Sequence, residues 1–173
     1  MRGWLIGAAM TGVIVAVSVG VVRARERDQT RTTELDKPLQ RIYGTAIMAS
    51  DVREARLLKL VPEAGGGDEA VQRALENRLL ILNEMKRTPA ADPGRDAIAA
   101  RRQNWTAAWP AGTDLPGLMA KCGTTDQSLD SWFRGDLQIA AFLATRFGQG
   151  GDPAADPKFN EWLADLRRRA NLR

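Results

Sequence analysis

The chain has 173 residues, a formal net charge of +4, no histidine and one cysteine, Cys122. Without histidine it lacks the usual general base at neutral pH and the commonest metal ligand. One cysteine forms neither an intrachain disulfide nor a cysteine-based zinc site. The sequence therefore excludes Ser–His catalysis, Cys–His catalysis and His-ligated metal chemistry within one chain. The small positive charge does not indicate nucleic-acid binding, and no motif indicates a cofactor or a metal.

The N-terminal part contains an uninterrupted apolar run over residues 3–22. As a helix with a rise of about 1.5 Å per residue, this run would be roughly 30 Å long, which is the thickness of the hydrocarbon core of a bilayer. The flanking residues suit the membrane interfaces, with a tryptophan near the start and arginines after the end: Trp4, Arg23, Arg25 and Arg27. We therefore predict a single transmembrane helix.

Two questions remain open for this segment. A cleaved secretory signal has a shorter apolar stretch, so the length of the run and the arginines after it favour a retained anchor over cleavage within residues 1–24. The same arginines favour a cytoplasmic position for the C-terminal part, because positively charged flanks stay on the cytoplasmic side. An exported C-terminal part is the alternative, since this rule weakens for long segments.

Small side chains recur at every fourth position of the apolar run. They lie on one face of a helix, where they allow a second membrane helix to approach closely: Ala8, Gly12, Ala16 and Gly20. We expect this face to pack against other membrane protein subunits or a second copy of the chain, with membrane lipid around it.

The composition divides the chain into a transmembrane anchor (1–23), a juxtamembrane linker (24–36) and an extramembrane domain (37–173). The domain is rich in alanine, leucine and arginine and has few clusters of β-branched residues. We therefore predict an all-α fold, in which a single transmembrane helix precedes a small bundle of four to six helices.

The first helical pattern of the domain begins at Leu39. Its apolar residues keep helical spacing, and Ser50 with Asp51 resembles a cap. One bent helix or two short helices are predicted, ending before Pro62. Residues 111–125 are expected to be mostly loop, with a short turn at 118–121. Further helices are predicted after Asp68 and over residues 95–109, 127–147 and 158–171.

Two sequence features predict close packing. Trp105 and Trp109 are four residues apart on one helix, and we expect them to pack in the core or at an interface rather than to form a ligand platform. Gly135 lies inside the longest predicted helix of the domain, where it indicates a close crossing with another helix.

The last two predicted helices carry the best candidate surfaces for a protein partner. The final helix is amphipathic and basic; docking on the domain is favoured, and lying on an anionic membrane is the alternative. The candidate partner-docking residues combine aromatic side chains with C-terminal arginines: Trp132, Phe133, Phe159, Trp162, Arg167, Arg168 and Arg169.

Carboxylates are the remaining candidates for catalysis. Asp130 with Arg134 and Asp165 with Arg169 have the spacing of surface ion pairs, so these acids need no catalytic role. We predict no catalytic residue. The sequence favours a membrane-anchored accessory, assembly or scaffold subunit of a bacterial-type membrane complex that acts by helix–helix contacts. The alternatives are a lysis or envelope-remodelling factor with an exported domain, and an anchored carboxylate-dependent hydrolase of the cell envelope.

Overall fold

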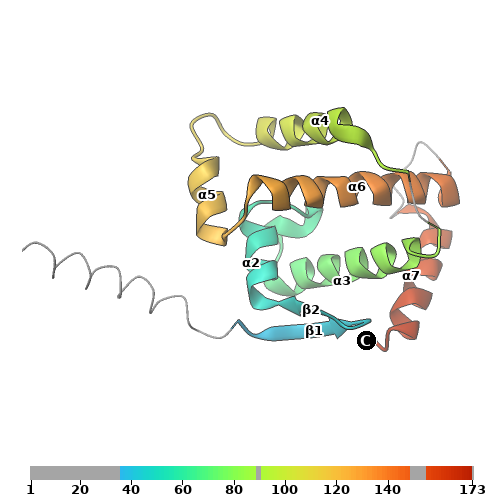
Figure 1. Ribbon diagram of the computed structural model, residues 1–173. Helices are drawn as coiled ribbons and strands as arrows, with labels where there is room; N and C mark the ends of the chain where they lie inside the picture. Colours follow the sequence, from blue (N-terminus) through green and yellow to red (C-terminus); the bar gives the residue numbers. More distant parts are fainter. Residues whose placement is uncertain (1–35, 89–90, 149–154, 173) are drawn as a thin grey trace, which may run out of the picture. The chain divides into compact units, whose positions relative to one another are not determined.

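The computed structural model describes residues 36–88, 91–148 and 155–172 (Figure 1). The chain divides into two units, Met1–Asp36 and Lys37–Arg173, and the second is described below. The expected transmembrane segment lies outside the described residues, as do its packing face and flanks: Ala8, Gly12, Ala16 and Gly20, with Trp4, Arg23, Arg25 and Arg27. Among the helices of the described part, none is long and apolar enough to cross a membrane.

The second unit begins with a β-hairpin. Strand β1 (Pro38–Ile42) pairs antiparallel with β2 (Thr45–Met48). Tyr43 and Gly44 form a two-residue turn with φ values of 46° and 87°, as a type I′ turn requires. The helix predicted from Leu39 onward is therefore wrong over these residues. The turn reverses the chain, and β-branched side chains of both strands enter the core.

Helix α2 (Ala49–Leu57) follows β2 directly. The predicted cap is only partly right: the N-cap is Met48 and Ser50 lies inside the helix, but Asp51 does stabilise the first turn by accepting a hydrogen bond of 2.8 Å from the Met48 backbone N–H. A short 3₁₀ helix, η1 (Pro62–Gly65), leads to α3 (Asp68–Met85). The buried stripe of α3 continues over about four turns: Val71, Leu75, Leu80, Ile81 and Met85.

Four more helices complete the described unit: α4 (Gly94–Ala107), α5 (Leu115–Cys122), α6 (Asp126–Phe147) and α7 (Pro157–Arg169). Helix α5 replaces most of the loop expected over residues 111–125. Asp114 caps it by accepting a hydrogen bond from the Gly117 N–H at 2.9 Å, and Gly123 ends it with a left-handed φ of 73°. The described part thus has six α-helices, within the predicted number, and is mostly helical, although the hairpin departs from an all-α fold.

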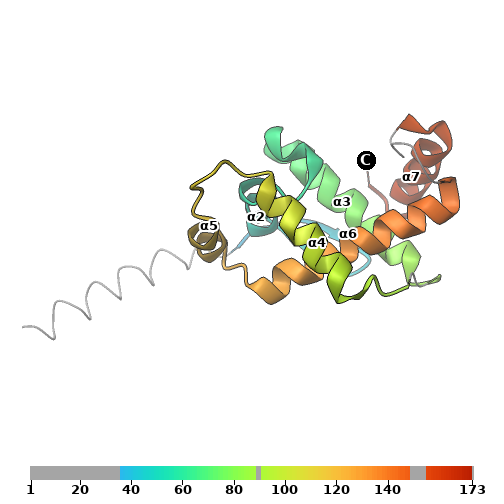
Figure 2. The same cartoon turned by 90° about the horizontal axis from the view of Figure 1, so that it is seen from above.

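The helices form layers around α3 and α6. Helix α6 lies between α4 and α3, and the hairpin packs on the other side of α3 (Figure 1). From above, α4 crosses α6, and α7 lies near the C-terminal end of α6 (Figure 2). Core side chains come from the hairpin and from five helices, and those with almost no exposed surface include Ile47, Leu58, Val71, Leu80, Leu129, Phe133 and Leu166.

Trp105 ties α4 to the segment after α2. Its indole N–H donates a buried hydrogen bond of 2.8 Å to the Leu58 carbonyl. Its ring lies 5.9 Å from that of Trp109 and 5.8 Å from that of Phe133. The tryptophan pair is therefore packing, as predicted.

Replacing Trp105 with phenylalanine should lower the free energy of unfolding by about 1–3 kcal/mol, because the buried Leu58 carbonyl loses its donor. Urea denaturation followed by circular dichroism measures this loss. Trp109→Phe is the matched control: Trp109 is only half-buried, so its loss should be smaller. Equal losses in both variants would show that the hydrogen bond adds nothing to the stability.

Candidate functional site

Arg78 of α3 reaches α6 at the position where α6 has a glycine. A Cβ atom built on Gly135 would lie 2.5 Å from the Arg78 Nη2 atom, so only glycine leaves room for the guanidinium in its present place. Gly135 therefore does lie at a crossing with another helix, but the group that approaches it closely is a side chain and not the helix backbone. The second helix is α3, and an arginine side chain fills the space between the two helices.

The Arg78 guanidinium makes three kinds of contact with α6. Its Nη1 atom forms an ion pair with the Asp136 carboxylate. Its Nη2 atom donates a hydrogen bond of 2.9 Å to the Trp132 carbonyl, and its central carbon lies 3.9 Å from the centroid of the Trp132 ring. Arg101 of α4 approaches the other oxygen of Asp136 at 3.4 Å. One carboxylate thus links three helices.

These charges are largely removed from water. The side chains of Arg78 and Asp136 are 13% and 20% exposed, while that of Arg101 is 36% exposed. Burial lowers the pKa of the Arg78 guanidinium. Burial also raises the pKa of Asp136, although the positive charges of Arg78 and Arg101 act in the opposite direction. For both partners, the cost of removing the charge from water is the largest effect on the pKa. A buried ion pair of this kind adds little net stability to a fold. Charged groups with shifted pKa values cluster at functional sites, so this place is a candidate functional centre.

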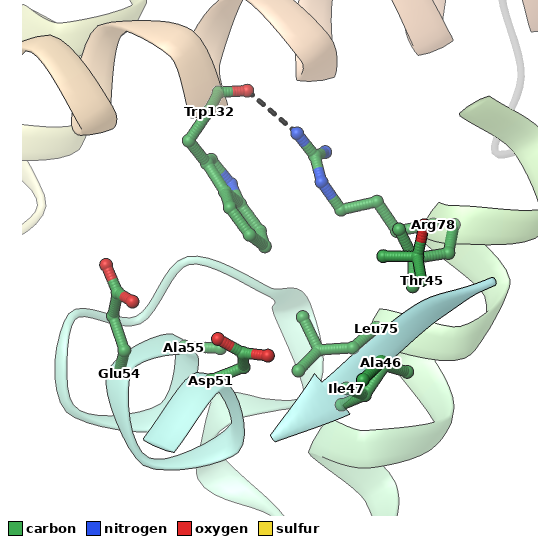
Figure 3. Close-up of a pocket in the computed structure, with 10 residues that line it drawn as sticks. Thr45, Ala46, Ile47, Asp51, Glu54, Ala55, Leu75, Arg78 and Trp132 are labelled. Atoms are coloured by element: carbon green, nitrogen blue, oxygen red, sulfur yellow. Dashed lines mark hydrogen bonds between the residues drawn. The ribbon is translucent and has the colours of Figure 1, made fainter. Parts of the chain in front are cut away.

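Two hollows lie beside this centre, and Arg78 and Trp132 line both. The smaller has a volume of about 160 Å³ and lies against β2, α2 and α3. Figure 3 shows the Asp51 and Glu54 carboxylates on one side of it and Arg78 on the other. Asp51 also caps α2, and Glu54 accepts a hydrogen bond of 2.7 Å from the Thr124 hydroxyl. Both acids therefore have structural roles.

The larger hollow is an open groove of about 570 Å³ between α3, α6, α7 and η1. Its walls are mostly apolar, and its charged lining groups are Arg78, Arg101, Asp136 and Glu63. The main apolar contributions come from Val61, Ile81, Ile139, Leu143, Phe159 and Leu163. This combination of a large apolar wall with few charged groups is typical of a binding site.

The acidic residues considered from the sequence form ion pairs, and the single cysteine has a raised pKa. Asp130 pairs with Arg102 at 3.0 Å and Arg134 pairs with Asp92, so the predicted Asp130–Arg134 pair is wrong. The predicted Asp165–Arg169 pair is confirmed at 3.0 Å. Burial raises the pKa of the Cys122 thiol, and the negative charge of Glu54 adds to this shift. In the described ranges, no three acidic or cysteine side chains converge as a metal site.

The predicted docking residues occupy different environments. Trp132 lies at the centre described above, and Phe133 is completely buried, so its ring belongs to the core. Phe159 and Trp162 of α7 pack with Phe147 of α6, at ring distances of 5.6 and 5.4 Å.

The arginines of the last helix have partners within the fold. Arg167 donates to Asn77 and forms an ion pair of 3.0 Å with Glu76. Arg168 and Arg169 both pair with Asp165, and both lie near the surface. Helix α7 therefore docks on the domain, as favoured from the sequence.

Sequence reasoning missed Arg78 and Arg101 as site residues. Arg78 lies seven residues after Val71 and seven before Met85, which places it on the buried stripe of α3. A single arginine within such a stripe is the signal that could have found it. Its partner lies 58 positions away, and no local pattern identifies that residue.

A second candidate surface is the outer face of the hairpin. Leu39, Arg41 and Tyr43 are exposed, and Leu39 and Tyr43 keep 36% and 51% of their surface. Tyr43 has a left-handed backbone, which is unfavourable for an aromatic residue. Because its ring is half exposed, packing within the described unit gives little compensation for this conformation.

Comparison of the chain with protein-family models, with curated protein sequences and with solved structures finds no match.

Replacing Asp136 with asparagine should destabilise the unit by about 2–4 kcal/mol, because Arg78 then stays buried without a counter-charge. Asp130→Asn is the control on the same helix. Its carboxylate is 48% exposed, and the loss there should stay below about 1 kcal/mol. Urea denaturation of both variants tests the difference, and equal small losses would refute the assignment of Arg78 and Asp136 as a buried pair.

Proposed function

We propose that the chain is a membrane-anchored accessory or assembly subunit of a bacterial-type membrane complex, and that its folded unit contacts a protein partner through the hairpin. The observation that carries this proposal is Tyr43, an exposed aromatic side chain held in a left-handed turn. Such backbone strain persists where it serves a function, and aromatic residues are enriched in protein interfaces.

The neighbouring side chains support the same role. Leu39 adds apolar area to the outer face of the hairpin, and Arg41, which donates a hydrogen bond of 3.0 Å to the Gly44 carbonyl, adds a charge between them. The exposed side chains of β1 and its turn thus combine a tyrosine, a leucine and an arginine. These side chains would suit the centre and rim of a modest interface.

The sequence supplies the membrane part of the proposal. The apolar run over residues 3–22 would anchor the chain, and the small side chains at every fourth position would pack against another subunit or a second copy. The arginines after this run favour a cytoplasmic folded unit. In this proposal the anchor and the hairpin contact the same complex.

The Tyr43→Asn variant separates the effect of Tyr43 on folding from its proposed contact with the partner. Asparagine tolerates a positive φ, so the variant should fold with unchanged or slightly higher stability, by up to about 1 kcal/mol. The membrane partner that co-purifies with the tagged wild-type chain in mild detergent should be lost. The readouts are urea denaturation and quantitative mass spectrometry of the purified complex.

Lys59→Asn is the matched control, because Lys59 is another exposed residue with a positive φ, 49°, outside the hairpin. It should keep the partner. A Gly12→Leu and Ala16→Leu double variant tests the membrane face, with Val17→Leu and Val21→Leu as controls on the other side of the helix. The proposal would be rejected if both the Tyr43→Asn variant and the Gly12→Leu/Ala16→Leu double variant kept the partner at the wild-type level.

A further inference from the structure

The groove between α3, α6, α7 and η1 has no role in the proposed hairpin contact. Its volume of about 570 Å³ lies within the range of roughly 300–1,000 Å³ that small-molecule sites occupy. Three helices supply its apolar wall, and large side chains such as Leu143, Phe159 and Leu163 reach it from α6 and α7. A long apolar group is the ligand feature that such a wall would bury.

The charged groups of the groove specify the other end of the ligand. Asp136 is neutralised by its ion pair with Arg78, and Arg78 is further held by the Trp132 carbonyl. Arg101 meets Asp136 at 3.4 Å, its guanidinium carbon lies 5.1 Å from the centroid of the Phe133 ring, and its side chain remains 36% exposed. Two guanidinium groups thus share one carboxylate. Since Arg78 forms the closer ion pair with it, Arg101 keeps a positive charge that this carboxylate balances less well.

One further charged group bears on where an anion could bind. Glu63 lines the groove from η1 and is exposed. Its negative charge would repel an anion there, which leaves Arg101 as the favourable position for an anionic head group.

We propose that this groove binds a single acyl chain with a carboxylate head, as in a long-chain fatty acid, with the carboxylate at Arg101 and the chain along the apolar wall. The inference rests on the proposed membrane anchoring for the source of the ligand and for the internal standard of the test below, where absence of label on residues 1–35 would show that the anchoring, and not the groove, has failed. Binding itself depends on the described residues and can be measured with added fatty acid.

The test uses the full chain in phosphatidylcholine nanodiscs with a photoactivatable, diazirine-bearing fatty acid. After illumination, proteolysis and mass spectrometry locate the label. We expect label on α6 and α7 peptides that line the groove, and label on residues 1–35 serves as the internal standard for exposure to the bilayer. An amine with the same chain and diazirine should label the groove much less, because its charge is opposite.

Variants of the groove distinguish the contribution of the carboxylate head group to binding from that of the acyl chain. Arg101→Gln should lower groove labelling about tenfold relative to the internal standard, as expected for loss of one charge-assisted hydrogen bond. Glu63→Gln removes a charge from the same groove but should not lower the labelling. Ala140→Trp should block the groove, while Ala141→Trp, at the next and exposed position of α6, should not.

Several results would overturn the proposal. They are absence of groove label in the wild type, equal labelling by the amine, and labelling that Arg101→Gln leaves unchanged. Stronger groove labelling by a photoactivatable phosphatidylglycerol than by the fatty acid would show that the occupant is a two-chain lipid, which also contradicts a single-chain site. None of these results depends on the protein partner, so this proposal and the hairpin interface can fail separately.

Discussion

The contact between Arg78 and α6 is the constraint on which the arrangement of the folded unit depends. Gly135 leaves the space, Asp136 supplies the counter-charge, and the Trp132 carbonyl and ring hold the guanidinium in place. Arg101 adds the third helix. At this crossing a flexible, charged side chain takes the place of ordinary apolar packing. Because burying its charge costs free energy, the relative position of α3 and α6 depends on the groups that bind the guanidinium.

This contact also defines the two hollows. Arg78 lies at the crossing between α3 and α6 and lines both hollows, the one next to the hairpin and the one towards α7. The hairpin closes one side and presents its outer face, including Tyr43, away from the core. The groove on the other side keeps an apolar wall and a partly exposed arginine. The folded unit thus combines a buried ion pair, an exposed hairpin face and an apolar groove, which are the features on which the proposals of partner and ligand binding rest.

Much of this fold follows from local sequence patterns, and the exceptions have physical causes. The apolar stripes locate both α3 and α6, although α3 begins after Gly67 without a side-chain cap and α6 is capped by Thr125. The hairpin was missed because its short apolar run fits helical spacing as well as strands, and the turn at Gly44 with burial of Ile47 decides between them. Helix α5 was missed because Pro116 and Gly117 weaken its pattern, whereas its cap stabilises it. The central ion pair needs tertiary structure, since its partners are far apart in sequence.

A double-mutant cycle tests the central claim most directly. Arg78→Met and Asp136→Leu are made singly and together, and the free energy of unfolding is measured for all four chains. The account predicts that the double variant is more stable than the sum of the single losses implies, with a coupling energy of about 1–3 kcal/mol, because each single change leaves a buried charge unpaired. Additive losses within about 0.5 kcal/mol would contradict the claim that this ion pair braces α3 against α6.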